Sequence, residues 1–311
     1  MPYTPKYPIY IISKGRSDTR MTSRSLEEIG VDYKIVVEDS EYDDYASVID
    51  PKKVLALPTD FRENPKFAIP DELGQMGGSI PARNFVWEHS TENGHEKHWI
   101  MDDNIRYFYR LNRNKKIRVT DGTIIRCSED FSDRYENVKI SGMNYAFFCP
   151  KDQKRPPYYK NTRIYSCILI DNSVQHRWRG KYNEDTDLSL RILKDGHCSI
   201  LFNAFLCGKA ATMAMKGGNT EEIYNKSNSD KFDNRRRFAD TLQYHHPDVT
   251  VVTKKWGRYH HHVDYSHFIQ NNKFKLKEGL NIPRKVNNYG MKLVQTQPIE
   301  NSEEEEEFDY E

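Results

Sequence analysis

The amino-terminal part of the chain alternates short β-branched runs with amphipathic segments, and this alternation limits the folds open to it. Strand-like runs at residues 9–12, 33–37 and 53–57 are separated by a helix-like segment that ends at Gly30 and by a shorter one at residues 41–49. The order β-α-β-α-β is typical of a parallel sheet covered by helices. Ligands of such sheets bind at the carboxyl ends of the strands, so the polar residues that follow each run are candidates for a site.

The clearest candidate follows a fourth strand-like run at residues 98–101, which leads directly into Asp102, Asp103 and Asn104. Ionised carboxylates are costly to bury, so an aspartate pair is a poor continuation of a buried strand. Mg²⁺ and Mn²⁺ favour oxygen ligands and often share them with substrate phosphates. The stretch therefore predicts a metal-assisted phosphate site. The alternative is that these residues only form a turn.

Two further segments offer groups for an anionic ligand. Ser13, Lys14, Gly15 and Arg16 form a small, basic turn after the first strand, and such a turn presents backbone N–H groups to an anion. The turn is neither a Walker loop nor a GxGxxG fingerprint. Arg83 lies in the first turn of a helix opened by a proline, where a cation gains nothing from the helix dipole. Its expected partner is an anionic ligand or a carboxylate elsewhere in the chain.

The most regular helix-like segment, residues 183–196, begins with Glu184, Asp185 and Asp187. Acids in a first turn stabilise the helix dipole. The functional interpretation is that one of them acts as a general base or binds a hydroxyl group. The remaining expected elements are helices at residues 123–135 and 230–243 and strands at residues 146–149, 164–170, 198–202 and 249–252.

Residues 105–180 interleave aromatic and basic side chains, most clearly in the loop at residues 151–160. Unpaired or everted bases are bound by such combinations, although the tyrosines of a solvated loop also pack on the protein body. Three histidines follow at residues 260–262, and in a strand His260 and His262 would share a face. They offer a metal ligand, a phosphate contact or only a surface cluster, and they lack a zinc-site spacing.

The net charge of +1 conceals an uneven distribution. Residues 300–311 contain eight acids and no base, so residues 1–299 carry a net charge of +9. A basic body suits a polyanion such as nucleic acid or a nucleotide, and we expect the acidic tail to be disordered. The alternative is that this charge only keeps the protein soluble. The five cysteines show no Cys-x-x-Cys pair, and there is neither a long apolar run nor a signal peptide, so we expect a cytoplasmic protein without membrane association.

In their order along the chain, these segments resemble a known class of enzymes. The Ser-Lys-Gly-Arg turn, the Arg83-Asn84 helix, the strand ending in Asp-Asp-Asn and the NEDTDLSLR helix are similar to those of GT-A glycosyltransferases, which use nucleotide sugars and a "DxD" metal motif. More narrowly, residues 8–265 resemble the TET-associated glycosyltransferases and their bacteriophage relatives, which are thought to glycosylate hydroxymethylated DNA pyrimidines. The resemblance implies an α/β, GT-A-like Rossmann-type mixed sheet, mostly parallel, with helices on both faces. It also implies one domain over residues 1–275, with a nucleotide-binding half (about 1–110) and an acceptor half (111–275), followed by an extension at 276–311 that carries the acidic tail.

The resemblance also implies roles for individual residues. The nucleotide pocket would be lined by Ser13, Lys14, Gly15, Arg16 and Glu38, with Arg83 on the diphosphate and Asp102 on the ribose. The metal would be bound by Asp103, Asp102 and His262, the last matching loosely (His261 is the other option), and Asn104 stands where many relatives have a third acid. Asp185, next to Glu184, matches the catalytic base of inverting members.

The substrates implied are a nucleotide-diphosphate sugar, with a UDP sugar expected, and a hydroxymethylated pyrimidine such as hydroxymethylcytosine in DNA. A divalent cation, Mn²⁺ or Mg²⁺, is the implied cofactor, and a phage protein of this kind would work in the host cytoplasm. Three alternatives stay open. They are transfer to a protein or saccharide, a two-metal nucleotidyl or phosphoryl transferase, and a DNA-binding protein without chemistry, in which the acids are turns.

Overall fold

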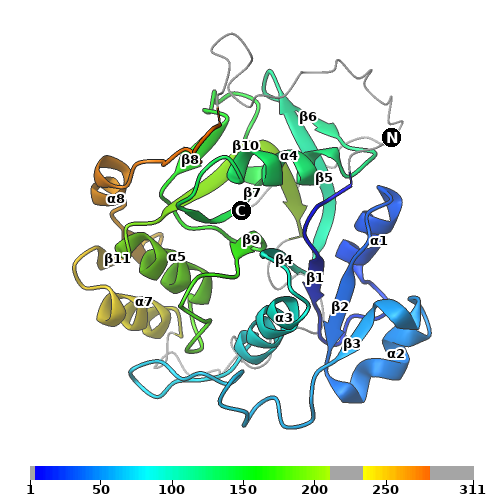
Figure 1. Cartoon of the computed structure of the whole chain (residues 1–311). Helices are drawn as coiled ribbons and strands as arrows, with labels where there is room; N and C mark the ends of the chain where they lie inside the picture. Colours follow the sequence, from blue (N-terminus) through cyan, green and yellow to red (C-terminus); the bar gives the residue numbers. More distant parts are fainter. Residues whose placement is uncertain (1–3, 211–233, 281–311) are drawn as a thin grey trace.

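The computed structural model describes residues 4–210 and 234–280, which form a large sheet, helices on both of its faces and a smaller two-stranded sheet (Figure 1). The acidic tail lies outside the described residues. The large sheet has ten strands. They are β1 (Ile9–Ile12), β2 (Lys34–Val37), β3 (Val54–Ala56), β4 (Lys97–Asp102), β5 (Ile105–Asn112), β6 (Lys115–Arg118), β7 (Val138–Tyr145), β8 (Tyr158–Lys160), β9 (Cys167–Asp171) and β10 (Cys198–Lys209).

The strands of the large sheet lie in the order β3-β2-β1-β4-β9-β7-β10-β5-β6, with β8 paired to β10. Strands β1 to β4 are mutually parallel, and β7 and β10 are parallel to each other. Only β9, β5 and β8 run against the common direction. The expected α/β architecture with a mixed, mostly parallel sheet is confirmed.

Helices cover both faces because side chains of successive strand residues point to opposite sides of the sheet. Trp99 and Met101 of β4 face one core, and Ile100 between them faces the other. The first core also contains residues of α1 (Met21–Glu28), α2 (Tyr42–Ala46) and α4 (Thr123–Ser132). The second contains residues of α3 (Ile80–Glu92) and α5 (Glu184–Lys194). Both cores are continuous across several strands, so the central strands are buried on both sides.

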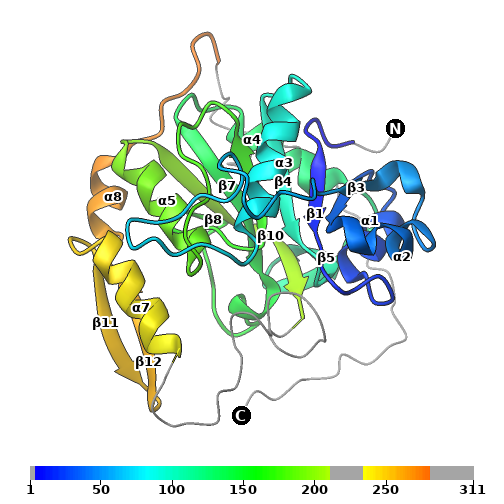
Figure 2. The ribbon, with the colours of Figure 1, turned by 90° about the horizontal axis from the view of Figure 1, so that it is seen from below.

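The described part of the carboxyl-terminal region forms a separate layer beside α5, visible at the edge of the molecule in Figure 2. It consists of α7 (Asn234–His245), β11 (Thr250–Lys255), β12 (Arg258–Val263) and α8 (Ser266–Asn271). Leu242, Val263 and Phe268 of this layer form a small core with Leu190 and Leu193 of α5. We call α7, β11, β12 and α8 the carboxyl-terminal module. The expected helix at 230–243 and strand at 249–252 correspond to α7 and β11.

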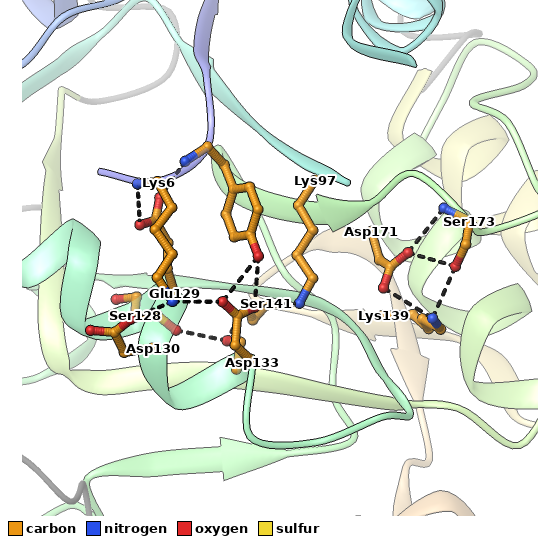
Figure 3. Close-up of polar contacts among 12 residues, drawn as sticks. Lys6, Lys97, Ser128, Glu129, Asp130, Asp133, Lys139, Ser141, Asp171 and Ser173 are labelled. Atoms are coloured by element: carbon orange, nitrogen blue, oxygen red, sulfur yellow. Dashed lines mark hydrogen bonds and ion pairs between the residues drawn. The ribbon is translucent and has the colours of Figure 1, made fainter. Parts of the chain in front are cut away.

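A polar cluster fixes the amino-terminal segment at the amino end of the sheet (Figure 3). Asp133, directly after α4, accepts hydrogen bonds from the hydroxyl of Tyr7 at 3.0 Å and from Lys97 Nζ at 2.7 Å. Glu129 accepts from the backbone N–H of Lys6 at 2.7 Å and from that of Tyr7. Lys97 opens β4, whereas Asp102 closes it, so this cluster lies at the end of β4 opposite to the aspartate pair. Its role is to hold the first strand in place.

One expectation for the middle of the chain is wrong. Residues 146–149 do not form a strand: Ala146–Phe148 is a 3₁₀ helix, labelled η3, that leaves the sheet after β7. The polar residues within β7 hide that strand, because they interrupt the apolar run that marks a buried strand. The basic and aromatic stretch after Asn104 is the hairpin of β5 and β6, closed by Arg113 and Asn114 at φ of 50° and 63°, the left-handed pair that a tight hairpin needs.

Candidate active site

The carboxyl ends of the parallel strands bring most of the candidate residues together. Ser13 follows β1, Glu38 follows β2 and Asp102 ends β4. The register pairs Ile12 with Asp102 across β1 and β4, so the basic turn after β1 lies beside the aspartate pair. This is the edge of an open α/β sheet where ligands bind.

The aspartate pair is a turn as well as a cluster of functional groups. Thr22, at the start of α1, donates its hydroxyl to the backbone oxygen of Asp102 at 2.6 Å and its N–H to that of Asp103 at 3.3 Å. The same hydroxyl accepts the N–H of Ile105 at 2.8 Å. The backbone of the turn is therefore satisfied by α1, and both carboxylates are left for other contacts.

Asp103 is bound by the turn after β1. Its carboxylate accepts a hydrogen bond from Ser13 Oγ at 2.8 Å and forms an ion pair with Arg16. Ser13 Oγ also contacts the hydroxyl of Tyr45 at 2.6 Å, and the backbone N–H of Arg16 donates to that hydroxyl at 3.0 Å. Burial raises the pKa of Asp103 and outweighs the lowering by Arg16 and Ser13. A further cation near this carboxylate would favour its ionised form.

Asp102 lies between two cations. It accepts hydrogen bonds from Lys209 Nζ at 2.8 Å, from Arg83 Nη2 at 3.1 Å and from Ser166 Oγ at 2.6 Å. Burial alone would raise the pKa of Asp102, but Lys209 and Arg83 hold it well below its usual range. The ionised form of Asp102 is therefore favoured by its two cationic neighbours.

Arg83 connects the aspartate pair to the first turn of α5. Its side chain is buried, and its guanidinium lies 3.5 Å from Asp185 Oδ1 and 3.9 Å from Glu184 Oε1 in addition to its contact with Asp102. The indole of Trp178 covers it at 4.7 Å. The sequence leaves two possible partners for Arg83, an anionic ligand or a carboxylate of the chain, and the carboxylates are present. Contact with a diphosphate stays a prediction.

Asp185 and Arg83 each have a buried side-chain atom without a hydrogen-bond partner among the described residues. Arg83 Nη1 and Asp185 Oδ1 are both buried, lie 3.5 Å apart and have no hydrogen-bond partner among the described residues. Burial, together with the negative charges of Glu184 and Asp102, raises the pKa of Asp185 to about 7 against the opposing effect of Arg83. A carboxylate with such a pKa is suited to take a proton near neutral pH.

The other acids of α5 differ from Asp185. Glu184 accepts a hydrogen bond from Ser79 Oγ at 3.3 Å. Asp187 is buried and pairs with Arg179 at 2.9 Å, with Arg191 at 2.8 Å and with His246 Nε2 at 3.0 Å. These partners hold the pKa of Asp187 far below its usual range although burial opposes them. Asp187 is a structural anchor of the helix.

The remaining residues of the predicted nucleotide pocket pair with acids of α2 and its surroundings. Lys14 Nζ lies 2.8 Å from Glu38 Oε1, which also pairs with Arg62 at 2.6 Å. The backbone N–H of Gly15 donates to Glu41 at 3.0 Å. The positive charge of Lys14 and the N–H of Gly15 in the turn after β1 are thus paired with carboxylates. Binding of a nucleotide here stays a prediction.

His262 is not brought to the aspartate pair. It lies exposed on β12 in the carboxyl-terminal module. Nowhere in residues 4–210 and 234–280 are three His, Cys, Asp or Glu side chains grouped as metal ligands, so His262 does not complete a set with Asp102 and Asp103. His261, the other option, is partly buried on the same strand.

The donor chemistry of the turn nevertheless fits a divalent cation. The side-chain oxygen of Asn104 is buried and has no hydrogen-bond partner within the described residues. Together with the carboxylates of Asp102 and Asp103 it offers an all-oxygen set, which Mg²⁺ and Mn²⁺ prefer. The cation would share Asp103 with Arg16 and Asp102 with Lys209.

Three residues of the site have no clear sequence signal. Lys209 ends β10, and its register opposite Ile105 of β5 places it beside the aspartate turn. Ser166 precedes β9, and the hydroxyl of Tyr145, at the end of β7, contacts Ser166 Oγ at 2.6 Å. Only the position of Lys209 and Tyr145 at strand ends marks them, and this requires knowing that β7 and β10 continue past their apolar parts.

Comparisons with known proteins bear on the identity of the chain. The sequence profile of the TET-associated glycosyltransferases matches residues 7–218. A search of curated proteins found no match. Among solved structures, glucosyl-3-phosphoglycerate synthase from Mycobacterium tuberculosis, crystallised with Mn²⁺, uridine diphosphate and phosphoglyceric acid, is similar with a TM-score of 0.44 and 10% identity over 84% of this chain and 87% of that one. No helix in the described part is long and apolar enough to cross a membrane. Because the family profile covers well over half of its length, the chain belongs to the TET-associated glycosyltransferase family and is a glycosyltransferase.

Proposed function

We propose that this enzyme transfers a sugar from a nucleotide-diphosphate sugar, a UDP sugar in the first instance, to the hydroxyl group of a hydroxymethylated pyrimidine in DNA. The proposal also includes a divalent cation at the aspartate turn. Family membership supports glycosyl transfer. The donor, the cation and the acceptor are supported by the chemistry of the site and by the charge of the body.

One observation carries the proposal. Arg83 is buried between Asp102, at the carboxyl end of a central strand, and Asp185, at the start of α5. Glycosyl transfer needs positive charge where the diphosphate departs and a base where the acceptor hydroxyl attacks. Arg83 and Asp185 would supply these two functions within one site, and each has a buried atom that pairs with the other at 3.5 Å but has no hydrogen-bond partner among the described residues.

In the reaction, the acceptor oxygen forms a bond to the anomeric carbon, and the bond from that carbon to the diphosphate breaks. Asp185 takes the proton of the acceptor hydroxyl, and the nucleoside diphosphate leaves with the bonding electrons. Arg83 and Lys209 stabilise the negative charge that develops on the leaving group, because preformed charges in a buried site cost no reorganisation. A direct displacement of this kind inverts the anomeric centre.

Asp103, Asp102 and Asn104 would hold the divalent cation. When bound, it would neutralise part of the diphosphate charge and so make the nucleotide a better leaving group. Ser13, Lys14, Gly15, Arg16 and Glu38 would line the nucleotide side of this site. The division of the chain into a domain at 1–275 and an extension at 276–311 is kept as part of the proposal.

The acceptor is inferred from charge and from family. A body with a net charge of +9 over residues 1–299 favours a polyanion. The family profile is named for its association with TET proteins, and DNA pyrimidines are the acceptors that this resemblance implies. Transfer to a protein or a saccharide is the competing reading, and acceptor competition assays distinguish the two.

The deciding experiment measures thermal unfolding with UDP, GDP and ADP, each with and without Mn²⁺. We expect a rise in melting temperature for one diphosphate that depends on the cation and disappears in Asp103→Ala. Transfer is then assayed by mass spectrometry of hydroxymethylated DNA incubated with the matching sugar nucleotide. Absence of any shift would refute the nucleotide-sugar proposal. Consumption of a nucleoside triphosphate without a sugar donor would favour a nucleotidyl or phosphoryl transferase.

A further inference from the structure

A cavity adjoins the residues of the candidate active site. It has a volume of about 240 Å³ and lies at the carboxyl end of β7. Its walls are mainly aromatic and basic, and include Tyr145, Phe148, Arg155, Tyr159, Arg163 and Tyr165. Drug-sized ligands occupy about 300–1,000 Å³, so this cavity has room for one small ring system.

The cavity shares a wall with the active site. The hydroxyl of Tyr165 lies 3.5 Å from Thr186 Oγ1, and Thr186 follows Asp185 in α5. The hydroxyl of Tyr145 lies 3.5 Å from Lys209 Nζ, which binds Asp102. A ring bound against these two tyrosines would therefore place its substituents next to the proposed base.

The aromatic rings form a ladder from the active site to the surface. Tyr165 and Tyr145 are nearly parallel, at 14° and 6.1 Å between centroids, and Tyr145 stacks on Phe147 at 5.1 Å. Phe148 lies 4.3 Å from Phe147, and these two phenylalanines are 43% and 49% exposed. Adjacent exposed phenyl rings at the mouth of a cavity offer π faces on which a base can stack.

The two arginines of the cavity have no acidic partner. Arg155 donates to the hydroxyl of Tyr159 at 3.0 Å and to Gln153, and Arg163 stacks on the ring of Tyr165 at 4.9 Å. Neither arginine forms an ion pair with a carboxylate in the described part of the chain, and the Nε atom of each is buried without a hydrogen-bond acceptor. Guanidinium groups in such a position favour an anion, and they bind phosphate well.

We propose that this cavity receives one nucleobase turned out of the base stack. Its face would stack on Tyr145, Tyr165 and Phe148, and the adjacent backbone phosphates would bind Arg155 and Arg163. This inference rests on the proposed function and specifies its acceptor as an unpaired or everted base. Arginines without an acidic partner distinguish this site from one for a neutral saccharide, which would use the same rings without needing a cation.

The test is fluorescence anisotropy with a labelled oligonucleotide that contains one hydroxymethylcytosine, as a single strand and within a duplex. We expect the single strand to bind more tightly, because unpairing a base in a duplex costs free energy. Phe148→Ala should weaken binding about 5- to 150-fold, the range for removal of one stacking ring. Arg155→Gln should weaken it and reduce the salt dependence by about one phosphate contact.

Arg24→Gln is the matched control, because Arg24 is exposed on α1, which contributes no residue to the cavity wall. It should change neither affinity nor salt dependence relative to wild type. Phe148 is partly exposed, so its replacement leaves the cores intact, and unchanged melting temperature checks this.

Wild-type affinity in both cavity variants, or equal binding of single strand and duplex, would overturn the inference. Loss of transfer to a saccharide or a peptide in these variants with unaltered DNA binding would also overturn it. Thermal shifts with UDP and Mn²⁺ are measured on the same variants. If the nucleotide binds and the DNA results are negative, only this inference fails; if no nucleotide binds, the proposed function fails.

Discussion

Replacement of Asp185 by asparagine tests the proposed chemistry most directly. The change keeps the shape of the side chain but removes its capacity to take a proton. Arg83 retains its contact with Asp102 at 3.1 Å, so the cation that would bind the diphosphate stays in place and the nucleotide should still bind. Loss of a general base lowers rates by about 10²- to 10⁴-fold, and we expect kcat/KM to fall within that range while the thermal shift with UDP is retained.

The pH dependence gives an independent readout. The base acts when it is deprotonated, and burial raises the pKa of Asp185 to about 7. Activity should therefore fall as the pH is lowered through 7, and kcat/KM should be about tenfold lower at pH 6 than at pH 8. In Asp185→Asn this acidic limb should disappear. Initial rates from release of the nucleoside diphosphate, measured across this range, provide the assay.

Glu184→Gln is the control for this experiment, since Glu184 lies one residue away and farther from Arg83. It should keep the rate within a few fold and preserve the acidic limb. A flat wild-type profile between pH 6 and 8, or an Asp185→Asn enzyme with full activity, would refute the assignment of Asp185. Loss of activity in Glu184→Gln alone would transfer the role to Glu184.

Three further substitutions probe other parts of the structure. Asp103→Ala should abolish the cation-dependent thermal shift with the diphosphate, and a retained shift would contradict the proposed cation site. Lys209→Met removes a charge-assisted hydrogen bond to Asp102, which should lower kcat/KM about 10- to 100-fold in steady-state kinetics. An unchanged value would show that Lys209 does not act on the leaving group. Asp133→Asn leaves Lys97 without its ion pair, and we expect a loss of about 2 kcal/mol in the free energy of unfolding by urea at pH 7, less than for a fully buried pair because Asp133 is partly exposed. Burial would raise the pKa of Asp133, but Lys97 and Lys6 hold it below its usual range. The stability that this pair contributes to the wild type is therefore present above about pH 4 and is lost as the pH falls further. The difference in stability between wild type and Asp133→Asn should shrink in acid. A difference that is independent of pH would contradict this explanation.

The sequence predicts the first half of the sheet well because its signals are local. The runs that become β1, β2, β3 and β4 are apolar and β-branched, and each ends in polar residues, so both the strands and the edge that carries the site can be identified. The acids at the start of α5 are equally visible, since capping and periodicity define that helix.

The second half of the sheet is less predictable because its strands are marked by long-range pairing. Within β7, Lys139, Ser141 and Asn144 break the apolar pattern, yet the strand is held by β9 on one side and β10 on the other. The strand at 198–202 continues to Lys209 for the same reason. Missing these extensions also conceals Tyr145 and Lys209, two residues of the candidate site.

The partner of Arg83 illustrates what sequence alone leaves open. Its position in a first helical turn indicates that a negative group is required, but the choice between a ligand and a carboxylate depends on how α3 and α5 lie relative to β4. The metal role of His262 is implied only by the resemblance and stays a prediction. Its strand belongs to the carboxyl-terminal module, and within the described residues it does not form a group of three metal ligands with the aspartate pair.

The hydrogen bond between Asp187 and His246 joins α5 to the carboxyl-terminal module. His246, just after α7, contacts the carboxylate of Asp187. Asp187 lies two residues after Asp185, the proposed base. The family profile ends at residue 218, so the proposed catalytic groups and His246 lie in different portions of the chain. A change at His246 would therefore alter the support of α5 from outside the part of the chain that the family profile covers.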